Sequence, residues 1–216
     1  MCNCTEVDTV SRYTYESENN NANLETYEWD NVWWEQTGRE DARRLLYIGD
    51  SISCATRRAI TAASENKVLV DGFGTSKALD NPFLFDAIRL FAKQQSYRNA
   101  VLFNNGLHGW HLADDTEYAC YYERAVQFLL DEFGDTPIFI LLTTSVANAE
   151  REARVQRRNA ITAEIAAKYR LPIVDLYAVS VEFSELRSAD GVHYTAEGYA
   201  KFAEKILADL QTADVK

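Results

Sequence analysis

Five short apolar runs, separated by helical patterns, constrain the fold of this chain more than any other feature. Each run is bounded by turn residues, which is typical of strands buried in a parallel sheet. The runs cover residues 45–49, 67–70, 100–103, 137–142 and 172–175. Helical patterns lie at about 52–65, 82–95, 115–132 and 149–169, and a last helix, capped by Thr195, is expected to end near Leu210. This alternation predicts an α/β fold with one five-stranded parallel sheet, right-handed crossovers and helices on both faces.

The region before the first run has a different composition. Residues 1–26 are polar and rich in Asn, Ser, Thr and Glu, so we expect a strap or tail there and one domain over residues 27–216. The segment 27–34 then holds three of the four tryptophans. We favour the interpretation that it covers one edge of the core, because aromatic side chains bury large areas. The alternative is an aromatic shelf for a sugar or an acyl group.

The net charge of −11 limits the possible partners. It argues against nucleic acid, which is bound mainly through Lys and Arg contacts to phosphates, and against an anionic membrane surface. No apolar run approaches the roughly 18–20 residues that a membrane span needs. The start of the chain lacks a basic and then apolar secretory signal, so a protein that begins naturally at Met1 is expected in the cytoplasm.

Polar residues and glycines follow three of the predicted strands. Ser51 comes after the first, Gly72 and Gly74 follow the second in a predicted turn at 71–76, and Asn105 and His108 follow the third. In open α/β sheets, ligands bind just beyond the carboxyl ends of the strands. We therefore expect these residues on one rim, together with the loop that precedes the last helix.

That late loop contains the partners that a serine nucleophile needs. A serine hydroxyl is a poor nucleophile unless a base takes its proton, and His193 can be that base. Asp190, three residues earlier, can hold the imidazole in the required tautomer. The oxyanion formed in an acyl transfer needs preorganised donors. The backbone N–H groups of Ser51 and Gly74 are candidates.

These blocks resemble those of the SGNH/GDSL hydrolase superfamily. Gly49-Asp50-Ser51 after a strand resembles its first block, Gly74 its second, and Asp190-Gly191-Val192-His193 its last. The resemblance implies a three-layer α/β/α fold of flavodoxin-like topology and a serine esterase that acts on a small acyl ester without metal or organic cofactor. Trp110 and the segment 27–34 would suit a sugar, so an acetylated carbohydrate is the first expected substrate. Asp50 and Trp110 are the expected substrate contacts.

One block departs from the pattern of the superfamily. Its usual Gly-x-Asn-Asp after the third strand supplies an Asn side chain to the oxyanion hole, but here that register reads Gly106-Leu107-His108-Gly109. Either His108 is the donor or Asn105, just upstream, replaces it, since both side chains can donate. A metal pair of His108 and His111 is disfavoured because no third ligand follows at a suitable spacing.

The altered block keeps two other functions open. One is a non-catalytic binding module on the same fold, and the other is an acyltransferase that uses the same triad to acylate a sugar hydroxyl. The sequence predicts an esterase first, with the oligomeric state undetermined.

Overall fold

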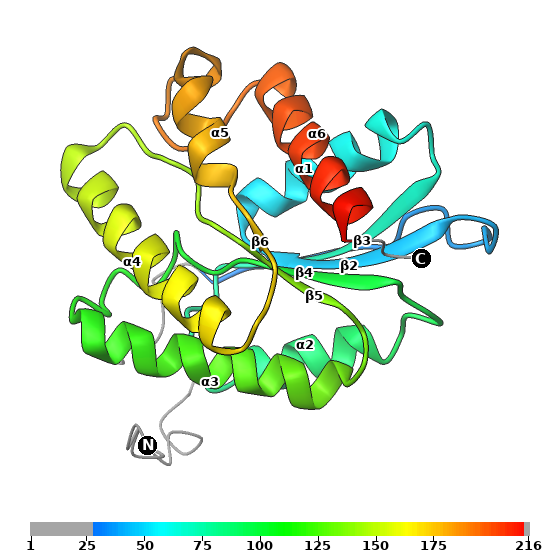
Figure 1. The fold of residues 1–216 in the computed structure, drawn as a ribbon, viewed down its shortest axis with the longest axis horizontal. Coiled ribbons are helices and arrows are strands. Elements are labelled where there is room, and N and C mark those ends of the chain that lie inside the picture. Colours follow the sequence, from blue (N-terminus) through cyan, green and yellow to red (C-terminus); the bar gives the residue numbers. More distant parts are fainter. Residues whose placement is uncertain (1–27, 214–216) are drawn as a thin grey trace.

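The computed structural model describes residues 28–213, and the strands within that range form one six-stranded sheet (Figure 1). Its order is β1-β3-β2-β4-β5-β6, and every neighbouring pair except β1–β3 is parallel. The strands are β1 (Asp30–Trp33), β2 (Arg43–Gly49), β3 (Val68–Thr75), β4 (Ala100–Phe103), β5 (Ile138–Leu141) and β6 (Ile173–Val174). Without β1, the parallel strands follow the flavodoxin-like order. The predicted fold class is confirmed.

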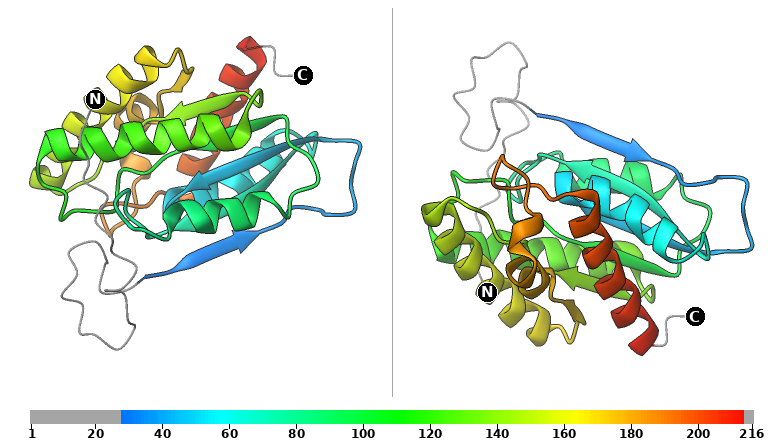
Figure 2. Two further views of the ribbon diagram at one scale, coloured as in Figure 1. Left: turned by 90° about the horizontal axis from the view of Figure 1, so that it is seen from below. Right: turned by 90° about the horizontal axis from the view of Figure 1, so that it is seen from above.

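The sheet has one strand more than predicted. The extra strand, β1, lies antiparallel along β3, with Asp30 opposite Thr75 and Trp33 opposite Gly72 (Figure 2). It is short and mostly exposed, so it has no apolar run from which a strand could be predicted. The predicted turn at 71–76 is wrong for a related reason: β3 continues through Thr75 because β1 and β2 pair with it on both sides.

The helices agree closely with the predicted patterns, and one short helix is new. They are α1 (Ser51–Ala63), α2 (Leu84–Ala92), α3 (Asp115–Phe133), α4 (Ala149–Lys168), α5 (Leu176–Glu182) and α6 (Ala196–Thr212). Thr195 caps α6 as predicted, and its hydroxyl accepts a hydrogen bond from the Gly198 N–H. The unpredicted helix, α5, has only seven residues, too few for a clear helical period.

The helices cover both faces of the sheet, which gives the predicted three layers (Figure 1). Leu45 and Tyr47 of β2 pack with Ile60 of α1 and Ile206 of α6 in one apolar cluster. The alternate residues of β2 join a second cluster with α2 and α3 on the other face. This division follows from the strand period of two, which sends successive side chains to opposite faces.

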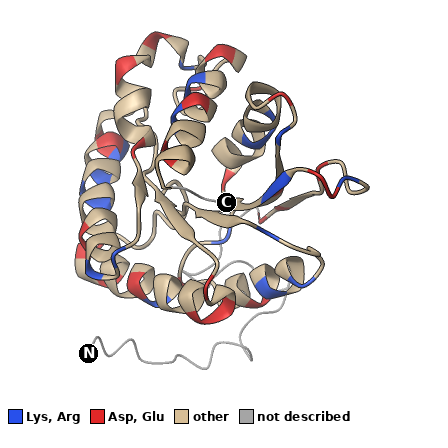
Figure 3. Cartoon of the chain, turned by 45° about the vertical axis from the view of Figure 1, so that its right-hand side comes forward, with Lys and Arg blue, Asp and Glu red and all other residues tan. Residues whose placement is uncertain are grey.

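Charged residues of both signs are mixed over the outer faces of the helices (Figure 3). Among the described residues, no helix is both long enough and apolar enough to cross a membrane.

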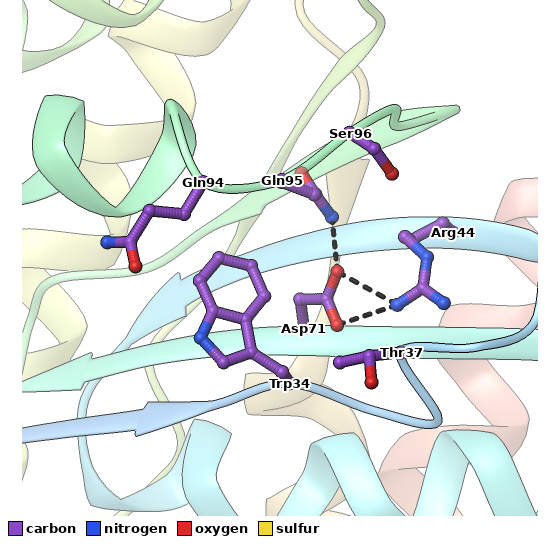
Figure 4. Close-up of a pocket in the computed structure, with 7 residues that line it drawn as sticks. All are labelled: Trp34, Thr37, Arg44, Asp71, Gln94, Gln95 and Ser96. Carbon is purple, nitrogen blue, oxygen red and sulfur yellow. Dashed lines mark hydrogen bonds and ion pairs between the residues drawn. The ribbon is translucent and has the colours of Figure 1, made fainter.

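A buried ion pair holds the connection between β1 and β2 at the end of the sheet where β2 begins (Figure 4). Arg44 donates to both oxygens of Asp71, at 2.8 and 3.1 Å, and the two side chains are 5% and 1% exposed. The Asp71 carboxylate also accepts from Gln95 Nε2 and from the Glu35 N–H. A cavity of about 260 Å³ lies beside the pair, between Trp34 and Gln95. Because these charged groups bind one another, we interpret the cluster as structural.

Substituting Arg44 should therefore cost much of the stability of the fold. We expect Arg44→Met to lower the free energy of unfolding by about 3–5 kcal/mol, because it leaves the Asp71 carboxylate buried without its cation. Urea unfolding at neutral pH measures the loss. The control is Lys67→Met, which breaks an exposed pair with Glu65 and should leave the midpoint nearly unchanged. A loss below about 1 kcal/mol for Arg44→Met would contradict this role of the pair.

Candidate active site

Ser51 stands where β2 passes into α1, at the carboxyl end of the sheet. Asp50 is the N-cap of α1, and its Oδ1 accepts a hydrogen bond of 2.9 Å from the Ile52 N–H. Ser51 is the first residue of the helix, so its backbone N–H is one of the donors that the helix itself leaves unpaired. The junction forms locally, because a buried apolar strand is followed at once by a capping carboxylate.

The side chains of Ser51, His193 and Asp190 form one chain of hydrogen bonds. Ser51 Oγ lies 2.7 Å from His193 Nε2, and His193 Nδ1 lies 2.8 Å from Asp190 Oδ2. Ser51 and His193 are 142 residues apart in the sequence, so the fold alone brings them together. His193 and Asp190 are 41% and 52% exposed, which leaves the arrangement open to a ligand.

A tight turn holds Asp190 against His193. Asp190 Oδ1 accepts hydrogen bonds from the N–H groups of Val192 and His193, each at 2.9 Å. These two backbone donors, with the His193 side chain, lower the pKa of Asp190 to about 2. Gly191 sits inside the turn with φ of 78°, and a Cβ there would lie 2.9 Å from Ala147 Cβ. The turn therefore requires glycine, both for its backbone conformation and for its close approach to Ala147.

The tautomer of His193 follows from the state of Asp190. An ionised carboxylate can only accept hydrogen bonds, so the His193 ring donates to it through Nδ1. Nε2 of the neutral imidazole is then left to accept from the Ser51 hydroxyl. This is the arrangement in which His193 can take a proton from Ser51.

Gly74 lies in β3, between Gly49 of β2 and Asn31 of β1. A Cβ on Gly74 would lie 2.4 Å from Cys54 Sγ and 3.4 Å from the Asp50 carbonyl oxygen. The glycine thus brings the β3 backbone close to the start of α1. This close approach explains why the position has no side chain, although it belongs to a strand and not to the predicted turn.

Asn105 and His108 lie in the loop after β4, with different surroundings. Asn105 is buried, and its Nδ2 donates 2.9 Å to the Lys77 carbonyl oxygen. His108 is half-buried, with its ring in edge contact with Trp29 at 5.9 Å between centroids. His108 also lies near Asp50: burial raises the pKa of Asp50, and the charge of a protonated His108 partly offsets that rise. His108 is therefore close enough to Asp50, the residue before Ser51, for their charges to interact.

Arg158 of α4 holds this loop, and nothing in the sequence distinguishes it. Its guanidinium donates to the carbonyl oxygens of four loop residues at 2.7–3.1 Å: Gly106, His108, Gly109 and Leu112. The charge pattern of residues 151–158 predicts a solvated helix face. For Arg158 that prediction is wrong, since the residue is 1% exposed. No local signal separates it from the exposed arginines beside it, because its partners lie about 50 residues earlier.

The remaining predicted residues have other partners. Trp110 is half-buried, and its ring lies 5.1–5.5 Å from the guanidinium carbons of Arg151, Arg154 and Arg158. His111 Nε2 lies 2.8 Å from Asp80 Oδ2, so it is not paired with His108. Among the described residues, no three His, Cys, Asp or Glu side chains are grouped as metal ligands.

Comparisons with known proteins bear on the fold. No family model and no curated protein matches the chain. Among solved structures, it is similar to a lipolytic protein of the G-D-S-L family from Veillonella parvula, with 19% identity, a TM-score of 0.63, and coverage of 77% of this chain and 97% of that one. It is also similar to the C-terminal catalytic domain of peptidoglycan O-acetyltransferase A from Streptococcus pneumoniae, with 19% identity, a TM-score of 0.62, and coverage of 80% and 94%.

A third similar structure is an acetylxylan esterase from Geobacillus stearothermophilus, with 14% identity, a TM-score of 0.59, and coverage of 80% of this chain and 96% of that one. Each of these chains is matched over nearly its whole length. The comparisons therefore confirm the predicted resemblance at the level of architecture: this chain has the fold of the SGNH/GDSL hydrolases.

Proposed function

We propose that the protein is a serine hydrolase that cleaves carboxylic esters of small acyl groups through an acyl-enzyme on Ser51. The observation that carries this proposal is the unbroken chain of hydrogen bonds from Ser51 through His193 to Asp190. A binding module would have no use for this geometry, which is why we prefer an enzyme.

The first half of the reaction forms the acyl-enzyme. His193 Nε2 takes the hydroxyl proton as Ser51 Oγ bonds to the ester carbonyl carbon. Asp190 stabilises the resulting imidazolium, and its low pKa keeps it ionised. The carbonyl oxygen becomes an oxyanion, for which the N–H groups of Ser51 and Gly74 are the backbone donors, and Asn105 or His108 supplies a side chain. The carbon–oxygen bond to the alcohol then breaks, and His193 returns the proton to that oxygen.

The second half releases the acid. Water gives a proton to His193 Nε2 while its oxygen bonds to the acyl carbon, and the bond to Ser51 Oγ breaks as that oxygen recovers the proton.

Acetyl esters of carbohydrates are the first substrates to test, since similar structures include acetylxylan esterases. A second candidate is acyl transfer to a sugar hydroxyl, because another similar structure is the catalytic domain of an O-acetyltransferase. The two differ only in the acceptor. Product analysis with and without an added sugar distinguishes them, since a transferase forms a new ester and a hydrolase forms free acid.

A fluorophosphonate probe tests the proposal without knowledge of the substrate. Such a probe phosphonylates a serine only when a base activates its hydroxyl. We expect stoichiometric labelling of the wild type, with the adduct located on Ser51 by mass spectrometry, and labelling at least about 100-fold slower for His193→Ala. His111→Ala, which removes a histidine paired with Asp80, is the control and should label at the wild-type rate. Labelling of His193→Ala as fast as the wild type would refute His193 as the base.

A further inference from the structure

An open groove begins at Ser51 and His193 and continues between α1 and α6. These two helices lie side by side on one face of the sheet (Figures 1 and 2). The groove has a volume of about 750 Å³, which is within the range of ligand sites. Because both catalytic side chains line it, a molecule bound covalently at Ser51 is at its entrance.

The groove is lined mainly by alanines at helical spacing. Six of its lining residues are alanines: Ala55, Ala59, Ala62 and Ala63 of α1, with Ala196 and Ala200 of α6. Residues at these intervals share one face of a helix. Each side chain is a single methyl group, so the groove remains wide along its length and its walls offer no hydrogen-bond donor or acceptor at these positions.

The charged residue on the groove has a partner elsewhere. The guanidinium carbon of Arg58 lies 4.3 Å from the ring centroid of Trp33, so the charge is held over β1. Cys54, another lining residue, lies one helical turn from Ser51 and is a free thiol. Tyr199 also lines the groove, and its hydroxyl oxygen accepts a hydrogen bond from the Tyr194 N–H. Alanines thus make up most of the wall beyond the catalytic serine, and the polar groups of Arg58 and Tyr199 have partners of their own.

We propose that this groove binds a linear alkyl chain of the ester while the ester carbonyl is at Ser51. The inference rests on the proposed function and extends the substrate class beyond acetyl esters, which would leave the groove empty. The chain can belong either to the acyl group or to the alcohol, since both are joined to the same carbonyl carbon.

The length of the groove sets the length of the chain. Along α1, Ala59 is about 12 Å from Ser51 and Ala63 about 18 Å, at a rise of 1.5 Å per residue. An extended alkyl chain is a zigzag, so each carbon–carbon bond of about 1.5 Å adds only about 1.3 Å to its length. A chain of eight carbons, with seven such bonds, is therefore about 9 Å long. Such a chain would pass Ala55, at about 6 Å, and end between Ala55 and Ala59, within reach of a larger side chain at position 59. Filling the position of Ala59 should therefore exclude it and leave room for an acetyl group.

Two ester series test the groove. The first series lengthens the acyl group, from p-nitrophenyl acetate through butyrate and hexanoate to octanoate. The second lengthens the alcohol, from methyl acetate through butyl and hexyl to octyl acetate. Each kcat/KM is divided by the rate constant for hydrolysis of the same ester by hydroxide, which corrects for its intrinsic reactivity. In one series we expect a rise of about twofold for each methylene, because a half-open groove gives about half the effect of full burial. The total is about 60-fold over the six methylenes of the acyl series, or about 130-fold over the seven of the alcohol series. The series that rises identifies the part of the ester that lies in the groove.

Ala59→Phe should abolish this rise and leave the acetate with the shortest chain within about twofold of the wild-type rate. Ala59→Leu is the second variant, because it fills the same half-buried position with a smaller side chain. The control is Ala208→Phe, an exposed position of α6 that does not line the groove. The proposal is overturned if both series are flat or falling, or if the rise survives in both groove variants.

A binding measurement separates this inference from the proposed function. Ser51→Ala with methyl octanoate or octyl acetate in a calorimeter should show binding that is lost when Ala59→Phe is added. If the wild type cleaves no ester but this binding is observed, the proposed function is refuted and the assignment of the groove as an alkyl-chain site is supported. If esters are cleaved and neither ester binds, the groove assignment fails alone.

Discussion

Ser51→Ala should lower kcat for p-nitrophenyl acetate by about 10⁴- to 10⁶-fold, which is the largest effect expected of any single substitution in this chain. The variant loses the oxygen that would form the acyl-enzyme, and the 2.7 Å contact with His193 Nε2 disappears with it. Residual hydrolysis would come from water held near the oxyanion donors. A stopped assay with purified protein measures the loss, with buffer as the lower limit.

The fold of this variant should be unchanged. Asp50 still caps α1 through Oδ1, and alanine is favourable in a helix. Equal far-ultraviolet circular dichroism and a melting temperature within a few degrees of the wild type would show this. Ser96→Ala, at an exposed serine beside the Arg44 cavity, is the matched control and should keep full activity. If Ser51→Ala retained more than about a tenth of the activity, another group would have to be the nucleophile.

Asp190→Asn should lower kcat by about 10³- to 10⁴-fold. Its amide can donate to His193 Nδ1, which would move the imidazole proton to Nε2. That nitrogen then faces Ser51 with a proton and can no longer accept one. The backbone hydrogen bonds from Val192 and His193 can persist to the amide oxygen, so the turn itself should survive. Assays at a fixed pH near 8, with the variant and wild type at equal substrate saturation, give the ratio.

The pH profile of the wild type provides an independent check of Asp190. With its pKa at about 2, this carboxylate remains ionised from alkaline pH down to well below pH 4. Protonation of Asp190 therefore does not cause any loss of kcat between pH 7 and pH 4, and an acid loss in that range has to come from another group. Asp114→Asn is the control, because Asp114 also accepts two backbone N–H groups but caps α3. Activity of Asp190→Asn within tenfold of the wild type would argue against a triad.

Much of the site is readable in the sequence because its parts are local. A buried apolar run followed by Gly49-Asp50-Ser51 encodes a strand, a cap and the first turn of a helix within a few residues. Asp190 and His193 are three positions apart, so one turn with a glycine suffices to join them. The parallel order of the strands also follows from the alternation of runs and helices, since a parallel connection needs a crossover.

Other features depend on contacts between distant segments. The burial of Arg158, the pairing of β1 with β3 and the extension of β3 past Asp71 have no local pattern. Arg158 is buried because another segment accepts its hydrogen bonds, and the same holds for the inner part of β3. Asp71, for example, can lie inside the sheet because Arg44, Gln95 and the Glu35 N–H bind its carboxylate.

The amino-acid sequence by itself determined the five parallel strands, the five longer helices, the class of fold and the three residues of the candidate triad, because periodicity, caps and turns act over a few residues. Only the tertiary structure decided three features: the distance from Ser51 to His193, the hydrogen bonds from Arg158 to the loop that contains His108, and the alanine groove between α1 and α6. The physical reason is that these three features arise where segments far apart in the chain are packed together. Whether an alanine lines a groove or a core depends on the helix that packs beside it.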